Sequence, residues 1–126
     1  MCETGARHPD RLNPGVWASD EAGLRNDADR RVQMNLLVDY HTNVAQYPVW
    51  QAYLRKHQPP TLVVWGKNDP LFTEAGANAC ARDLKRVETH LLDTGHFALE
   101  EAAPEIAAHV LALLDRQEPE AVAAAH

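Results

Sequence analysis

Two short apolar runs, separated by a helix-length segment, constrain the fold of this chain more than any other feature. The run Thr61-Leu62-Val63-Val64-Trp65 has the length and composition of a strand, and residues 87–92 form a second run of the same kind. A strand that is apolar on both faces belongs inside a parallel sheet that helices cover. A helix over residues 73–84, with Thr73 as its N-cap, is expected between the two runs. The order strand, helix, strand therefore predicts the α/β class with a parallel sheet.

Helices are expected on both sides of these strands. Apolar residues at three- and four-residue steps predict an amphipathic helix over residues 29–46. Pro48 is expected to begin a second helix, which ends before Pro59-Pro60. A last helix is expected to carry Pro104 in its first turn. The apolar positions are Val32, Leu36, Leu37, Tyr40 and Val44 in the first of these helices, and Ile106, Val110, Leu113 and Leu114 in the last.

Composition excludes several classes of function. The 126 residues carry a formal net charge of -6 and a pI near 5.6, so the chain lacks the basic face that nonspecific nucleic-acid binding needs. Cys2 and Cys80 lie far apart without CxxC spacing, which argues against a disulfide framework and against a zinc site. No apolar run approaches the roughly 20 residues of a membrane span, and the N-terminus lacks the apolar stretch of a signal peptide. A cytoplasmic location is expected, with no nucleic-acid or membrane partner.

A polar residue follows each predicted strand. Asp69 lies between Gly66 and Pro70 in the first loop, and His96 follows Gly95 in the second. Open α/β sheets place their chemistry at the carboxyl ends of parallel strands, which lie about 4.8 Å apart, so the two side chains are expected to meet. A carboxylate that accepts a hydrogen bond from an imidazole fixes the tautomer of the ring and prepares it as a general base. The sequence thus predicts a catalytic pair of Asp69 and His96.

Simpler interpretations of these residues remain open. Asn68-Asp69-Pro70 is common turn chemistry, in which the Asp69 side chain bonds its own loop. His96 alone is also compatible with an ordinary loop histidine. His90, Asp93 and His96 lack the spacing of a metal site, so His90 is expected to be a surface-facing strand residue, and no metal is expected.

The sequences around the predicted pair resemble a known family. Trp65-Gly66-Lys67-Asn68-Asp69-Pro70 resembles the acid motif of the α/β-hydrolase superfamily, and Asp93-Thr94-Gly95-His96-Phe97-Ala98-Leu99-Glu100-Glu101 resembles its histidine motif. The similarity is closer to the epoxide hydrolase and haloalkane dehalogenase branch. Residues 47–114 also resemble the end of the helical cap followed by the last two strands and helices of that fold.

This resemblance implies a function for a complete enzyme. Asp69 would be the triad acid and His96 the general base, and the substrate would be a small, mostly apolar ester, epoxide or haloalkane, hydrolysed without a metal or an organic cofactor. The candidate substrate-binding residues are Trp50, Tyr53 and Phe97, although Trp50 and Tyr53 are equally compatible with packing of a cap against a core. The implied division is a loop and cap-like segment (1–58), the C-terminal part of the hydrolase core (59–116) and a frayed tail (117–126).

The chain also departs from the pattern of the family. It has neither the oxyanion-hole loop nor the nucleophile elbow, a glycine-flanked nucleophile on a sharp strand-to-helix turn, and Ser19, the only serine, has no strand before it. Two strands alone leave both sheet edges unpaired. The expected fold is therefore a C-terminal fragment of an α/β-hydrolase, inactive alone, which needs the missing N-terminal half or associates with itself. The alternative is a non-catalytic truncated relic, or an association module that pairs its strand edges with another chain.

Overall fold

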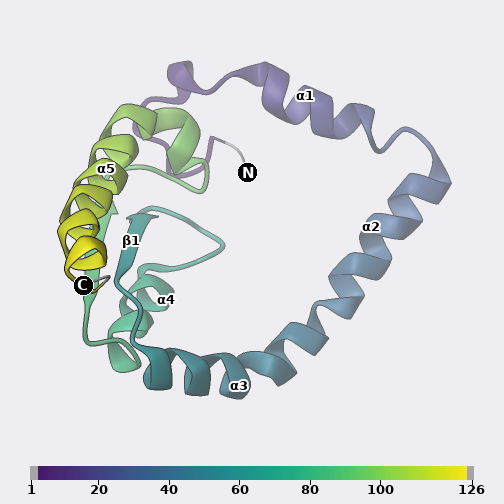
Figure 1. The fold of residues 1–126 in the computed structure, drawn as a ribbon. Coiled ribbons are helices and arrows are strands. Elements are labelled where there is room, and N and C mark those ends of the chain that lie inside the picture. The colour runs from purple at the N-terminus through teal and green to yellow at the C-terminus, as the bar shows by residue number, and fades with distance from the viewer. Residues whose placement is uncertain (1–2, 125–126) are drawn as a thin grey trace. The chain divides into compact units, whose positions relative to one another are not determined.

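The two predicted strands are present and pair in parallel. In the computed structural model, which describes residues 3–124, β1 (Thr61–Gly66) and β2 (Val87–Leu92) form a two-stranded sheet (Figure 1). The register pairs Thr61 with Val87 and Gly66 with Leu92. Both strands therefore end at the same edge of the sheet, and the loops that follow them start side by side. The described part of the chain is mixed α/β, as predicted.

The segment between the strands is helical but shorter than predicted. α4 (Glu74–Ala79) gives way to the 3-10 turn η2 (Cys80–Arg82), so the α-helix ends before the predicted limit at residue 84. Thr73 is the N-cap residue with extended backbone, but its side chain makes no cap hydrogen bond. Ala77 is buried where α4 packs beside the sheet.

The last helix, α5 (Ala98–Ala124), runs along the sheet and has an interruption near its start. The backbone leaves the helical region at Ala102 (φ -129°, ψ 29°), so Pro104 lies in the first turn of the resumed helix, as predicted. The predicted buried face is only partly correct, because Val110 and Leu114 are 42% and 54% exposed. A sheet of two strands is too narrow to cover the whole apolar stripe. Residues 117–124, expected to fray, are helical, and residues 125–126 lie outside the described part.

The chain divides into two compact units, and the first combines both ends of the described sequence. Residues 3–12 belong with residues 60–124, whereas the second unit is Asn13–Pro59. The N-terminal segment contains the 3-10 turn η1 (Pro9–Arg11), and Leu12 is one of the buried apolar residues of the first unit. The other buried apolar residues there are Val63, Ala77, Leu84 and Leu92. The hydrophobic core of this unit is therefore small.

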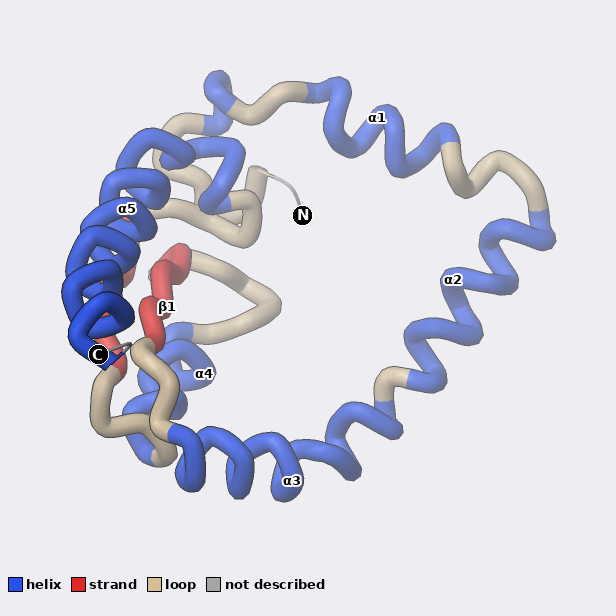
Figure 2. The backbone as a smooth tube through the Cα atoms, in the orientation of Figure 1, coloured by secondary structure: helices blue, strands red, loops and turns tan. Residues whose placement is uncertain are grey.

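The second unit consists of three helices, α1 (Pro14–Ala22), α2 (Asp27–Asp39) and α3 (His41–His57) (Figure 2). The predicted boundary between the second and third of these helices is wrong, because Pro48 lies inside α3 and the break falls at Tyr40. The physical reason is side-chain capping, since His41 Nδ1 lies 2.7 Å from the carbonyl oxygen of Val38 and Thr42 donates to that of Asp39.

Apolar side chains on α2 and α3 are exposed. α2 is helical, as its apolar stripe predicts, but the side chains of Leu37 and Val38 on it are 70% and 68% exposed. Further exposed apolar residues on these two helices are Val32, Met34, Leu36, Val44, Tyr47, Val49, Trp50 and Tyr53. Among the described residues, no helix has the length and apolar character needed to cross a bilayer.

Candidate active site

The loop after β1 is held in a fixed path by its backbone. The backbone N–H of Lys67 donates to the carbonyl oxygen of Leu92, and that of Asn68 donates to the carbonyl oxygen of Thr94. Hydrogen bonding between the two chain segments thus continues for two residues beyond β1. The backbone N–H of Asp69 then donates to the carbonyl oxygen of Gly66 (3.1 Å), which turns the chain. A Cβ at Gly66 would lie 2.2 Å from the carbonyl oxygen of Gly95, so glycine is required for the two loops to approach this closely.

The two carboxylate oxygens of Asp69 serve two different purposes. Oδ1 accepts hydrogen bonds from the backbone N–H groups of Leu71 (2.8 Å) and Phe72 (3.0 Å), which is the geometry of an Asx turn. Oδ2 lies 2.8 Å from Nδ1 of His96. The side chain of Asp69 is 7% exposed and that of His96 is 27% exposed. The turn interpretation and the paired interpretation of Asp69 are therefore compatible, because each uses its own oxygen.

The protonation of this pair follows from its hydrogen bonds. Burial acts to raise the pKa of Asp69, but the hydrogen bonds from His96, Phe72 and Leu71 outweigh it and hold that pKa below its ordinary value of 3.8. Asp69 is therefore ionised at neutral pH and can only accept, so Nδ1 of His96 carries the hydrogen. In the neutral ring, Nε2 then has the free lone pair. Nε2 makes no hydrogen bond with any residue that the structure describes.

Aromatic rings flank the imidazole of His96. The ring of Phe72 lies 5.6 Å away between centroids, and that of Phe97 lies 5.3 Å away in an edge-on arrangement. The indole Nε1 of Trp65 donates to the carbonyl oxygen of Phe72 (2.7 Å), which fastens the end of the Asp69 loop to β1. Phe97 and Phe72 therefore both lie beside the imidazole of His96, and substrate binding by Phe97 stays a prediction.

The other two candidate substrate-binding residues lie on α3, in the second unit. Trp50 and Tyr53 are 46% and 59% exposed. Their rings contact others on the same helix, Tyr47 at 5.6 Å from Trp50 and His57 at 4.4 Å from Tyr53. Substrate binding by Trp50 and Tyr53 stays a prediction.

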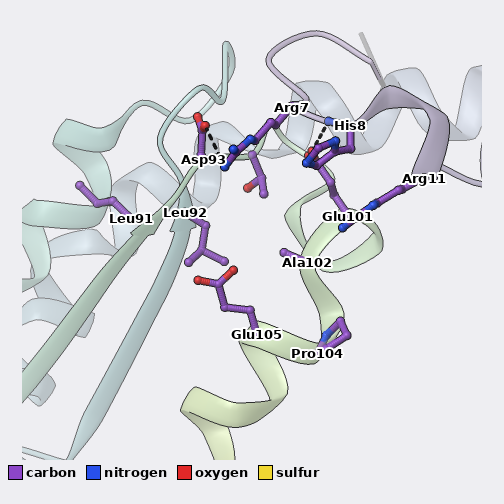
Figure 3. A pocket seen from close by; sticks show the side chains of 11 residues that line it. Arg7, His8, Arg11, Leu91, Leu92, Asp93, Glu101, Ala102, Pro104 and Glu105 are labelled. Atoms are coloured by element: carbon purple, nitrogen blue, oxygen red, sulfur yellow. Dashed lines mark hydrogen bonds and ion pairs between the residues drawn. The ribbon is translucent and has the colours of Figure 1, made fainter.

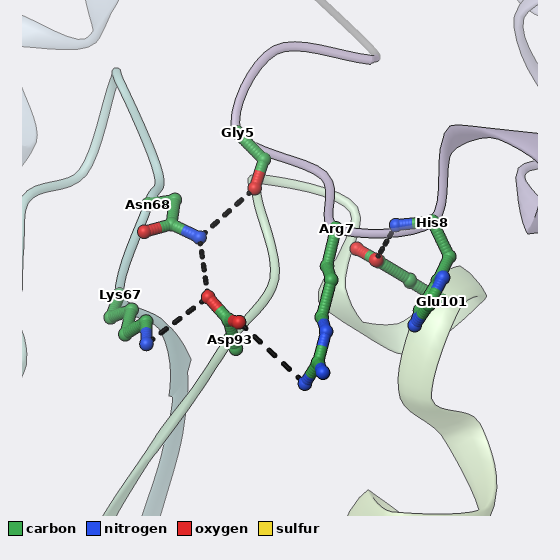
Figure 4. A network of polar contacts seen from close by, with 7 residues as sticks. All are labelled: Gly5, Arg7, His8, Lys67, Asn68, Asp93 and Glu101. Carbon is green, nitrogen blue, oxygen red and sulfur yellow. Dashed lines mark hydrogen bonds and ion pairs between the residues drawn. The ribbon is translucent and has the colours of Figure 1, made fainter.

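A polar network connects the two loops with the N-terminal segment (Figure 4). Asp93, at the end of β2, accepts a hydrogen bond from the Asn68 side chain (3.0 Å) and pairs with Lys67 (3.1 Å). Hydrogen bonds from these two residues lower the pKa of Asp93, and the charges of Lys67 and Arg7 add to the effect. Asn68 also donates to the carbonyl oxygen of Gly5 (3.1 Å). The network holds in place the loop that carries Asp69.

A pocket of about 380 Å³ lies beside this network, between the N-terminal segment, the end of β2 and the start of α5 (Figure 3). Charged residues of both signs line it, among them Arg7, Arg11 and Glu105. Glu101 is buried there, with Oε1 accepting from the backbone N–H of His8 (2.6 Å) and Oε2 without a hydrogen-bond partner among the described residues. Asp69 and His96 do not line this pocket.

His90, Asp93 and His96 do not come together in one metal site. Each side chain contacts a different charged residue: His90 contacts Glu88, Asp93 contacts Lys67, and His96 contacts Asp69. The side chain of His90 is 31% exposed, so it is partly covered and does not stand fully at the surface.

Sequence reasoning missed two contributions to the site. The bond from Trp65 to Phe72 closes the Asp69 loop, and the only sequence signal for it is an aromatic residue at each end of the loop. The N-terminal segment packs against the same loops, since a Cβ on Gly95 would lie 2.6 Å from the carbonyl oxygen of Thr4. No periodicity or motif within residues 3–8 indicates this contact.

Comparisons with known proteins support a hydrolase. The chain is 35% identical over 102 residues to an uncharacterized hydrolase of Saccharomyces cerevisiae, which covers 81% of this chain and 35% of the yeast protein. It is 26% identical over 125 residues to a poly(3-hydroxyalkanoate) depolymerase of Ectopseudomonas oleovorans, which covers 91% of this chain and 42% of that protein. No protein-family model matches the chain. No solved structure gives a significant match. The chain thus spans well under half the length of both relatives, and neither name points to the epoxide hydrolase branch.

Proposed function

We propose that this chain supplies the acid and the base of an α/β-hydrolase triad, as the C-terminal part of that fold. The observation that carries the proposal is the 2.8 Å contact between Asp69 Oδ2 and His96 Nδ1 at the carboxyl ends of two paired parallel strands. Asp69 holds the ring in the tautomer whose Nε2 accepts a proton. His96 removes a proton from a nucleophile or from an attacking water, and it later returns that proton to the leaving group.

The nucleophile is proposed to come from a polypeptide segment outside these 126 residues. No sequence in the chain has the form of a glycine-flanked nucleophile after a strand, and Ser19 lies within α1. A serine at the missing position would form an acyl-enzyme, with His96 as its activating base. An aspartate there would form an ester with an epoxide or a haloalkane, and His96 would activate the water that cleaves it.

The proposed substrate is small and mostly apolar, and an ester is favoured over an epoxide or a haloalkane. The apolar preference is supported by Phe72 and Phe97 beside the base, and Trp50 and Tyr53 are proposed to contact substrate as well. The ester preference rests on the bacterial relative, whose name specifies a polyester as its substrate. A metal or an organic cofactor has no part in this proposal.

The first test is the DNA immediately upstream of the codon for Met1, translated in frame. An uninterrupted frame that contains a strand, a glycine-flanked Ser or Asp and a helix is the expected result. The longer protein should then hydrolyse p-nitrophenyl esters in preference to epoxides and haloalkanes. His96→Ala should lower kcat at least about a thousandfold, whereas the control His41→Gln, a helix residue of the second unit, should leave it unchanged. A stop codon upstream, or a His96→Ala variant with full activity, contradicts the proposal.

A second candidate function is association without catalysis, and the exposed surfaces of the chain favour it. The sheet has only two strands, so each has an edge with no partner strand in the described part of the chain. Exposed strand edges and apolar patches are surfaces through which chains associate. Sedimentation velocity over a wide range of concentrations should show an oligomer if this function is correct. Leu91→Lys on β2 should weaken an association through the strands more than Leu99→Lys, at an exposed leucine of α5. A monomer at every concentration excludes this candidate.

A further inference from the structure

Three side chains that can ligate a metal converge between β2 and α5, apart from the Asp69–His96 pair. Glu88 and His90 lie two residues apart on β2, so they project from the same face of the strand. His109 reaches them from α5, and its ring stacks on that of His90 with centroids 3.7 Å apart. One possible ligand atom from each of the three residues lies within 4.8 Å of the others, and each residue is partly exposed.

The carboxylate of Glu88 contacts one histidine of the cluster and an arginine of α5. His90 Nε2 lies 2.6 Å from Glu88 Oε1, and Arg116 donates to Glu88 Oε2. Arg116 therefore orients the carboxylate through one oxygen, while the other oxygen faces His90. A hydrogen-bonded partner that orients a ligating carboxylate is a recurrent feature of metal sites.

We propose that Glu88, His90 and His109 form a binding site for one divalent transition metal, with zinc as the best match. Two imidazole nitrogens and one carboxylate oxygen are ligands that zinc prefers, and three protein ligands leave a fourth tetrahedral position for water. Ligand atoms about 2.0–2.1 Å from a tetrahedral zinc lie about 3.4 Å apart. Ligand atoms that lie as far as 4.8 Å apart must therefore approach by up to about 1.4 Å, whereas His90 Nε2 and Glu88 Oε1, 2.6 Å apart, must separate. The two rings must also leave their stacked arrangement, which their partial exposure permits.

The site lies at the other end of the strands from the Asp69–His96 pair. Glu88 is the second residue of β2 and pairs with Leu62 of β1, whereas Asp69 and His96 follow the opposite ends of the strands. A metal there would tie α5 to β2, the only two elements that supply ligands. Binding should therefore stabilise the fold of the first unit through linkage, because an unfolded chain does not hold the three ligands together. This inference does not depend on the proposed hydrolase function.

The test is zinc titration of the 126-residue chain, purified without a histidine tag, by isothermal titration calorimetry. We expect one zinc per chain, a zinc-dependent rise in Tm that a chelator reverses, and Co(II) absorption typical of a tetrahedral site. His90→Ala, His109→Ala and Glu88→Gln should each weaken binding at least tenfold, and His41→Gln, which removes an imidazole from another unit, should not. Far-UV circular dichroism of each variant shows whether it is folded, and Glu88→Gln keeps the size of the side chain if an alanine variant unfolds. Absence of binding to the wild-type chain, or equal binding by wild type and all three folded variants, overturns the proposal.

Discussion

Replacing Asp69 in two different ways separates its two structural roles. Asp69→Asn keeps an oxygen at the Oδ1 position, so the hydrogen bonds from the N–H groups of Leu71 and Phe72 persist, but it places an NH₂ group opposite the Nδ1–H of His96. Asp69→Ala removes all three hydrogen bonds. At about 1 kcal/mol net for each bond, Asp69→Asn should cost about 1 kcal/mol and Asp69→Ala about 3 kcal/mol.

Amide hydrogen exchange, measured by NMR, resolves this difference at individual residues. In Asp69→Ala the amides of Leu71 and Phe72 each lose an acceptor worth about 1 kcal/mol, so each should exchange about fivefold faster. In Asp69→Asn both should stay close to wild type. The amides of Lys67 and Asn68 are the control within the same loop, because they donate to backbone carbonyl oxygens near the end of β2 and not to Asp69.

The same pair of variants also tests the tautomer of His96. With Asp69 ionised, imidazole nitrogen shifts should show hydrogen on Nδ1 in the neutral ring, and Asp69→Asn should move it to Nε2, as the amide then favours an acceptor at Nδ1. Equal exchange of Leu71 and Phe72 in the alanine and asparagine variants would show that Oδ1 does not hold the loop. An unchanged tautomer in Asp69→Asn would refute the argument that the carboxylate selects it.

Two further predictions concern the same region of the fold. The pKa of Asp69 is lower in the folded protein than its ordinary value of 3.8, so near pH 3.8 the folded state binds fewer protons than the unfolded state. The interactions of Asp69 should therefore contribute their full stability above about pH 5 and lose it as the pH falls below 3.8. Urea denaturation from pH 7 to pH 3 measures this loss, and Asp69→Asn should show a smaller pH dependence than wild type. Gly66→Ala should destabilise the fold by about 2 kcal/mol or more, since its Cβ would overlap the carbonyl oxygen of Gly95. Gly76→Ala in α4, where a Cβ meets nothing within 4 Å, should instead stabilise by roughly 0.5–1 kcal/mol, and equal effects of the two alanines would contradict the proposed close approach.

The correct predictions from sequence concern features that neighbouring residues determine. The strands at 61–66 and 87–92 follow from continuous apolar runs, and parallel pairing brings Asp69 and His96 to one edge without information from other segments. The break at Tyr40 was missed because it depends on the side chains of His41 and Thr42 bonding carbonyl oxygens of the preceding turn, whereas Pro48 is the stronger breaker in sequence. The exposure of Val110 and Leu114 was missed for a different reason, since periodicity identifies an apolar face and says nothing of how wide a sheet lies beneath it.

The contacts that hold Asp69 against His96 come mostly from nearby residues. The contacts that build this pair come from residues 65–96: the bond from Trp65 to Phe72, the close approach of Gly66 to Gly95, and the Asx turn of Asp69. The N-terminal segment also contacts these loops, through Thr4 at Gly95 and Gly5 at Asn68. The two strands, their loops and this segment therefore account for the geometry of the pair. Catalysis has a stricter requirement, because Nε2 of His96 needs a nucleophile or a water held within hydrogen-bond reach, as well as donors for the developing oxyanion. The function proposed for Asp69 and His96 therefore requires a further segment that supplies the nucleophile and these donors, and the identity of that nucleophile decides between ester, epoxide and haloalkane chemistry.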